Sequence, residues 1–160
     1  MILYNFYSPV QADEWIVVDD VVMGGKSQGN FMINPQGKGV FEGNVSLENN
    51  GGFSSVRHTL AQKNVAGFCK VVLYLKGDGN TYQFRIKTNK SDYYAYVAEF
   101  NTTSNWSTIE IPFDTMYPSF RGQRLDAPNY PGKLIEEISF LIGNKKEVSF
   151  KLEIGRITLE

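Results

Sequence analysis

Carboxylates beside Gly-rich turns are the first residues in this sequence whose types could do chemistry. Asp19 and Asp20 precede a tight turn at Gly24-Gly25, and Glu48 precedes a second Gly-rich turn. A pair of carboxylates could perform acid–base work on a glycosidic bond, which requires a particular separation between the two groups. Asp and Glu also cap turns through their side-chain oxygens. A structural calcium ion is a third alternative, because Ca²⁺ takes oxygen ligands.

A guanidinium and a hydroxyl follow the second Gly-rich turn. Residues 49–52, which begin with Asn49, tolerate positive φ, so the backbone must reverse there. The chain then returns as a strand in which Phe53, Ser55 and Arg57 share one face. This pattern suits a polar recognition surface, and it equally suits an ordinary hairpin with a surface arginine.

Familiar catalytic arrangements are missing from the sequence. The chain has one histidine, His58, and one cysteine, Cys69, which are too few for a zinc site of the usual ligands. A Ser-His-Asp triad would have to use His58, and the sequence has no Gly-x-Ser-x-Gly motif. The Gly-Gly-Lys-Ser sequence of residues 24–27 lacks the first glycine of a P-loop, because Asp20 stands at that position. We therefore expect no enzyme activity and no cofactor.

Length and composition are those of one soluble domain spanning residues 1–160. The chain is 42% hydrophobic and 21% charged, and its formal net charge is −1. Because it has no block of basic residues, we expect no nucleic-acid partner. No apolar run approaches the roughly 20 residues of a membrane span. The N-terminal residues show neither a signal peptide nor a transit peptide, which predicts a cytoplasmic location.

Hydrophobic residues alternate with polar ones along most of the chain, which predicts short β-strands. One example is the run of Tyr82, Phe84 and Ile86, and nine or ten such segments separated by turn signals predict an all-β fold. We expect an antiparallel β-sandwich of jelly-roll type. In the last segment the apolar positions change parity, which predicts a β-bulge near Gly155-Arg156. Asp114 to Lys133 is expected to be a long irregular loop, and at most a turn of helix is expected around Leu60–Asn64 or within residues 112–135.

Several segments, in their order along the chain, resemble one family, that of the complex I intermediate-associated protein and its stand-alone prokaryotic relatives. The resemblance runs from about Trp15 to Ile157. The segments are Val18–Ser27, Phe41–Gly43, Ser46–Arg57, Gly77–Gly79 followed by Tyr82, Trp106 with Ile111–Phe113, and Phe120–Gly122.

This resemblance implies a galactose-binding-like jelly roll and a chaperone-like role in assembling NADH:ubiquinone oxidoreductase. It implies no catalytic residues. The first hypothesis is therefore a non-catalytic interaction protein with a protein partner, such as respiratory complex subunits. We expect a polar cluster at one end of the sandwich, framed by Gly-rich loops, in which Asp20 binds a partner or forms a salt bridge with an arginine. The candidate residues are Asp19, Asp20, Glu48, Asn49, Arg57 and Arg121.

The second hypothesis is a carbohydrate-binding module, since jelly rolls often carry sugar sites on a sheet face or on loops. It needs an aromatic platform with polar side chains that grip a small sugar ligand. The candidate aromatics are Tyr82, Tyr93, Tyr94, Tyr96, Trp106 and Tyr117, of which Tyr82, Tyr94 and Tyr96 have the parity of core residues.

Overall fold

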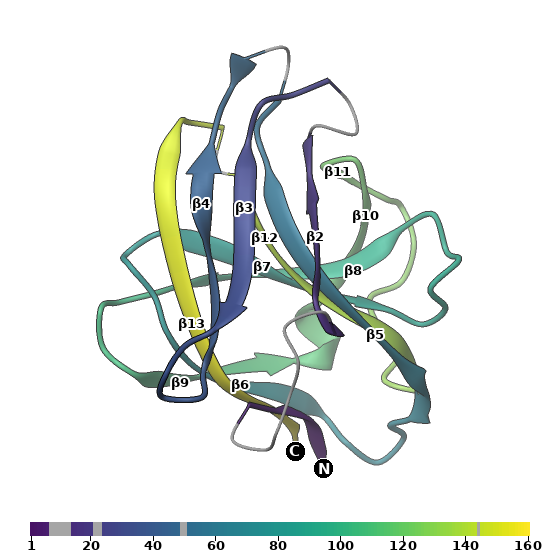
Figure 1. The fold of residues 1–160 in the computed structure, drawn as a ribbon. Coiled ribbons are helices and arrows are strands. Elements are labelled where there is room, and N and C mark those ends of the chain that lie inside the picture. Colours follow the sequence, from purple (N-terminus) through teal and green to yellow (C-terminus); the bar gives the residue numbers. More distant parts are fainter. Residues whose placement is uncertain (7–13, 21–23, 49–50, 144) are drawn as a thin grey trace.

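The computed structural model describes residues 1–6, 14–20, 24–48, 51–143 and 145–160. Antiparallel strands form two sheets that pack face to face as a β-sandwich (Figure 1). The two chain ends lie side by side, where the Leu159 amide donates to the Met1 carbonyl oxygen at 2.8 Å. The all-β jelly-roll prediction is confirmed.

One sheet has six strands, in the order β3-β4-β13-β6-β9, with β1 pairing with the C-terminal part of β13. Its register shifts between Ile154 and Arg156, which confirms the predicted bulge. The members are β1 (Ile2–Asn5), β3 (Gln28–Ile33), β4 (Gly39–Val45), β6 (Lys70–Lys76), β9 (Ser107–Pro112) and β13 (Val148–Leu159).

The other sheet has seven strands, in the order β11-β10-β8-β7-β12-β5-β2. Four of its strands, β5, β12, β7 and β8, pair along most of their length and form a continuous central surface. The members are β2 (Ile16–Asp19), β5 (Ser54–Asn64), β7 (Thr81–Lys87), β8 (Ala95–Asn101), β10 (Tyr117–Phe120), β11 (Gln123–Arg124) and β12 (Leu134–Ile142).

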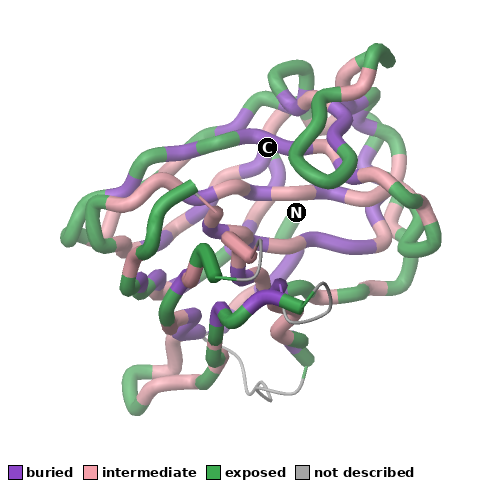
Figure 2. Tube along the Cα trace, turned by 90° about the horizontal axis from the view of Figure 1, so that it is seen from above, coloured by how far each residue is buried: buried purple, intermediate pink, exposed green. Residues whose placement is uncertain are grey.

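The core lies between the sheets and is rich in aromatic rings. Alternate residues of each strand point into it, so buried and exposed positions follow one another along the strands (Figure 2). The inward-facing side chains of β7, Tyr82, Phe84 and Ile86, are fully buried, as the alternation predicted. Large residues from both sheets meet there, among them Phe41, Leu73, Phe140, Phe150 and Leu152.

Of the sequence predictions about irregular regions, that of a long loop is wrong and one of the two places given for a helical turn is right. The stretch 114–133 is not one long loop, because β10 and β11 form a hairpin within it. Residues 60–64 are not helical but belong to β5, while the predicted helical turn in the Pro-containing stretch is the 3₁₀ helix Phe113–Thr115. Hydrogen bonding to β8 overrides the turn chemistry of Pro118, which occupies an edge region of the sheet where a missing N–H is tolerated.

Among the described residues, no helix is long and apolar enough to cross a membrane.

Candidate functional site

Asp20 is fully buried and organises the loops at one end of the sandwich. Its Oδ1 accepts a hydrogen bond from the Ser27 amide at 2.9 Å, and its Oδ2 accepts from the Ser27 hydroxyl at 2.6 Å. The Gly52 and Phe53 amides also donate to Oδ2, at 2.6 and 3.2 Å. Burial alone would raise the pKa of Asp20, but these hydrogen bonds outweigh it and lower the pKa below 3.8. Asp20 is therefore an ionised anchor that joins two loops.

The glycines around Asp20 are required by close approach to its carboxylate. A Cβ at Gly25 would lie 2.4 Å from Asp20 Cγ, and a Cβ at Gly51 would lie 2.5 Å from Asp20 Oδ2. Both distances are far inside van der Waals contact. Glycine at these two turns therefore allows both backbones to pack directly against one buried carboxylate.

Asp19 has a related architectural role. Its Oδ2 accepts from the Gly29 amide at 2.9 Å, and its Oδ1 accepts from the Ser54 hydroxyl. These contacts tie β2 to β3 of the opposite sheet and to β5 beside it. Both aspartates of the predicted cluster are thus satisfied by donors of this chain rather than turned toward solvent.

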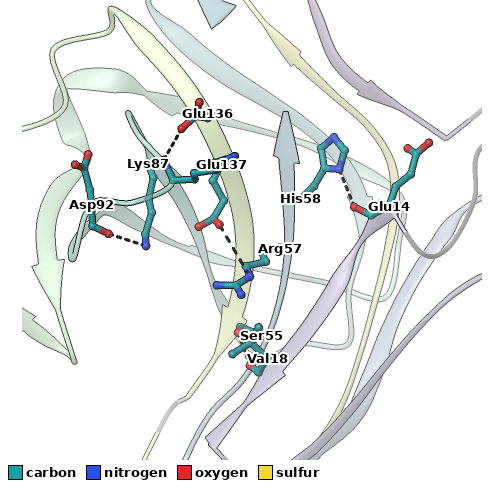
Figure 3. A network of polar contacts seen from close by, with 10 residues as sticks. Glu14, Val18, Ser55, Arg57, His58, Lys87, Asp92, Glu136 and Glu137 are labelled. Carbon is teal, nitrogen blue, oxygen red and sulfur yellow. Dashed lines mark hydrogen bonds and ion pairs between the residues drawn. The ribbon is translucent and has the colours of Figure 1, made fainter. Parts of the chain in front are cut away.

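Neither predicted arginine forms an ion pair with Asp19 or Asp20, and the two arginines lie on separate parts of the seven-stranded sheet. Arg57 lies on β5, and its Nε is 4.0 Å from Glu137 Oε1 on β12 (Figure 3). Arg121 lies in the hairpin between β10 and β11 with φ 49°, and its guanidinium lies 5.3 Å from the Phe120 ring centroid. Three strands, β12, β7 and β8, separate β5 from β10. The prediction of one cluster containing these residues and the aspartates is therefore wrong, as is the predicted Asp20–arginine salt bridge.

Glu48, the remaining candidate that the structure describes, does not add to a cluster. Glu48 is exposed, and its backbone carbonyl oxygen accepts from the Gly51 amide at 3.0 Å, so it takes part in the turn. Asn49 lies outside the described residues, and its role stays a prediction.

The outer face of the seven-stranded sheet carries a polar surface that the sequence alone did not identify. Cross-strand pairing places Arg57 opposite Ser139 and Ser139 opposite Arg85, so both arginines lie on one row across the sheet. The next row pairs Glu137 with Lys87. The alternation of β7 marked Arg85 and Lys87 as outward-facing, but only the register between distant strands brings them beside Arg57.

Arg85 is the central residue of this outer face. It is half-buried, and its Nη1 donates to Gln83 Oε1 at 3.2 Å. Burial lowers the pKa of the Arg85 guanidinium, while the Glu137 carboxylate acts in the opposite direction. Arg85 keeps its charge because even a lowered arginine pKa stays far above neutrality. The sheet therefore holds a fixed, partly desolvated cation at its centre.

One end of the outer face is hollowed into an open, mostly polar depression of about 440 Å³. Its lining includes Gln83 and Glu99, which are paired across β7 and β8. Lys145 and Lys146, from the segment that follows β12, also line it. The depression extends the polar outer face toward that end of the sandwich.

His58 has a structural environment. Its ring stacks on Trp15 with centroids 5.2 Å apart, and Nδ1 donates to the Glu14 carbonyl oxygen at 2.8 Å. It lies on the opposite side of β5 from Arg57, as Figure 3 shows. Within the described part of the chain, no group of three or more His, Cys, Asp or Glu residues is placed to hold a metal ion. The option of a structural calcium ion stays an untested prediction.

The fold is similar to that of several solved β-sandwich structures. The structure superposes on a family 11 carbohydrate-binding module from Clostridium thermocellum in complex with a beta-1,3-1,4-mixed-linked tetrasaccharide. The TM-score is 0.70 at 20% identity, and the match covers 99% of this chain and 93% of that chain. A CBM4 structure gives a TM-score of 0.56 at 13% identity over 94% of this chain and 88% of that chain. The agarase AgWH50C gives 0.60 at 10% identity, covering 100% of this chain and 24% of that chain. At these identities the likeness shows the fold alone.

The chain belongs to the complex I intermediate-associated protein 30 (CIA30) family, whose model matches residues 4–154. The family resemblance seen in the sequence motifs is thereby confirmed. No curated protein matches the chain.

Proposed function

We propose that this chain is a non-catalytic interaction protein that holds a partner polypeptide on the outer face of its seven-stranded sheet. The observation that carries this proposal is the match to the CIA30 family over nearly the whole chain, because the family's name describes association with assembly intermediates. Subunits of respiratory complex I (NADH dehydrogenase) are therefore the first partners to test. The protein would act as a chaperone-like assembly factor in the cytoplasm, the location that the sequence predicts.

The choice of face rests on how the polar side chains are used. At the loop end of the sandwich, the Asp19 and Asp20 carboxylates are occupied by donors of the chain itself. On the outer face, in contrast, Arg57 and Arg85 have few partners within the described residues. Unused donors on a rigid sheet are suited to recognition, because the sheet fixes their positions before binding.

The test is affinity purification from the native host's lysate, with captured proteins identified by mass spectrometry. Ser139 lies between the two arginines on the outer face, so Ser139→Tyr adds a ring at the centre of the proposed surface. Thr158→Tyr places the same ring on β13 of the other sheet and is the matched control. We expect complex I subunits with the wild type and Thr158→Tyr, and their loss with Ser139→Tyr. Equal capture by both variants, or no specific polypeptide with the wild type, would contradict the proposal.

A carbohydrate-binding module is the second candidate, favoured by the structural likeness to such modules. The outer face supplies Tyr117 and several polar side chains for this role, whereas the candidate platform residue Tyr82 is fully buried in the core. Isothermal titration with the mixed-linkage tetrasaccharide tests it directly. Binding that Ser139→Tyr abolishes would support a sugar ligand, and no heat at millimolar concentration would contradict one.

A further inference from the structure

Two arginines share one register row on the outer face of the seven-stranded sheet. Arg57 on β5 and Arg85 on β7 both lie beside Ser139 on β12. Since neighbouring strands are about 4.8 Å apart, the two backbones are about 10 Å apart. The same row, read across six strands, holds Ile16, Arg57, Ser139, Arg85, Val97 and Tyr117.

Most donors of these two guanidiniums are unused within the described chain. The contact of Arg57 with Glu137 is 4.0 Å long, which is an ion pair without a hydrogen bond. Arg85 makes one side-chain hydrogen bond, to Gln83. Among the described residues, Trp15 Nε1 is the one fully buried side-chain nitrogen or oxygen without a partner. The unused arginine donors are therefore open to solvent or to a ligand.

The charged side chains around the arginine row include more cations than carboxylates. Arg57, Arg85 and Lys87 surround the single buried carboxylate of Glu137. At the β10–β11 side of the face, Arg124 stacks on Tyr117, where Glu99 supplies a second carboxylate. Of these six charged residues four are cations and two are carboxylates, in a chain whose formal net charge is −1. The Lys87 ammonium already donates to the Asp92 carbonyl oxygen at 2.9 Å, so the two arginines carry the unused donors. Glu137 orients the two arginines without neutralising both, which leaves the face complementary to an anion.

We propose that this face binds an acidic segment of a partner polypeptide, with Arg57 and Arg85 each holding a carboxylate. The inference rests on the proposed function in taking the partner to be a protein. Arginine suits the role because its fork of donors matches a carboxylate bidentately.

The apolar residues of the face favour a peptide over a sugar as the ligand. Ile16 is 55% exposed at the end of the arginine row, and Leu141 and Val18 lie half-buried in the adjacent row. Such neighbours suit mixed acidic and apolar side chains. Tyr117 is the one aromatic ring on the described strands of this face, and the Arg124 guanidinium lies 4.8 Å from its centroid. Phe53, which directly precedes β5, is half-buried. Neither is a bare, exposed platform of the kind on which a sugar ring stacks.

The test is fluorescence anisotropy with a fluorescein-labelled oligoglutamate peptide, compared with an oligolysine peptide of the same length. We expect the wild type to bind oligoglutamate, with affinity falling as salt rises, and not to bind oligolysine. The variant Arg57→Gln, Arg85→Gln should bind at least about tenfold more weakly, since it loses two charge-assisted contacts. Arg156→Gln is the matched control and should bind as the wild type does, because Arg156 is exposed on the other sheet.

Three results would overturn the inference. One is equal oligoglutamate binding by the double variant and the wild type, with both shown to be folded by circular dichroism. Another is tighter binding of an oligogalacturonate than of oligoglutamate, which would assign the cations to an acidic sugar. The third is capture of the partner polypeptide by the double variant but not by Ser139→Tyr, which would leave the proposed function standing without the acidic segment.

Discussion

The loop end of the sandwich and the outer face of the seven-stranded sheet are both rich in charged side chains, yet they use them differently. At the loop end, Asp20 is fully buried and accepts four hydrogen bonds from Ser27, Gly52 and Phe53. On the outer face, most N–H donors of the Arg57 and Arg85 guanidiniums have no acceptor among the described residues.

This difference separates architecture from recognition. A buried charge must be satisfied within the fold, because an unpaired one costs several kcal/mol. A half-exposed arginine on a rigid sheet can leave donors to water at little cost and exchange that water for a ligand. Mutations at the loop end should therefore change stability, and mutations on the outer face should change binding.

The largest expected effect is that of Asp20→Ala. It leaves the buried Ser27 donors and the part-buried Gly52 and Phe53 amides without an acceptor, so we expect a loss of about 3 kcal/mol or more in the free energy of unfolding. Urea denaturation measures it. Glu48→Ala, at an exposed carboxylate of the same region, is the control and should stay within about 0.5 kcal/mol. If Asp20→Ala lowers the free energy of unfolding by less than about 1 kcal/mol, Asp20 does not have the architectural role assigned to it.

A smaller loss is expected for Gly25→Ala, whose Cβ would lie 2.4 Å from Asp20 Cγ. Overpacking of this kind costs about 1–3 kcal/mol. In an Asp20→Ala background the added cost should shrink, because most of the clashing carboxylate is gone, and a double-mutant cycle in urea measures that coupling. Additive losses would show that the cost of Gly25→Ala does not come from a clash with the Asp20 carboxylate.

Acidification should weaken the loop anchor gradually. Hydrogen bonds hold the folded pKa of Asp20 below its ordinary value of 3.8, so the stabilisation is complete above that value. It disappears as the pH falls from 3.8 through the lower folded pKa. Thermal unfolding at a series of pH values should show this acid-dependent loss in the wild type and a weaker one in Asp20→Asn. Identical pH profiles for the two proteins would contradict the assignment.

The smallest stability effect is expected for Arg57→Gln on the outer face. Its side chain is 45% exposed, and its ion pair with Glu137 is 4.0 Å long, so the free energy of unfolding should change by no more than about 0.5 kcal/mol. Differential scanning calorimetry checks this. A decrease of more than about 2 kcal/mol in the free energy of unfolding would show that Arg57 stabilises the fold as Asp20 does, which would contradict the difference between the two regions.

The strands and the core could be predicted from local pattern. Alternation assigned the inward side of β7 correctly, and the change of parity in β13 gave the bulge between Ile154 and Arg156. These features depend on the period of side chains along one strand. The hairpin of β10 and β11 is local, with Arg121-Gly122 as its turn. It was missed because Pro118 is typical of a loop, and the pairing of β10 with β8, which is distant in the sequence, makes this segment part of the sheet.

For the candidate site too, some features follow from local sequence and others only from the tertiary structure. The sequence by itself determined that Asp19, Asp20 and the neighbouring Gly-rich turns form special backbone, because glycine and short acidic side chains have strong local preferences. Only the tertiary structure decided that the aspartates bind the chain's own amides. It also decided that Arg57 and Arg85, 28 positions apart in the sequence, share one row across β12. The physical reason is that strand register is set by packing of the whole sheet against the core, which no short stretch of sequence contains.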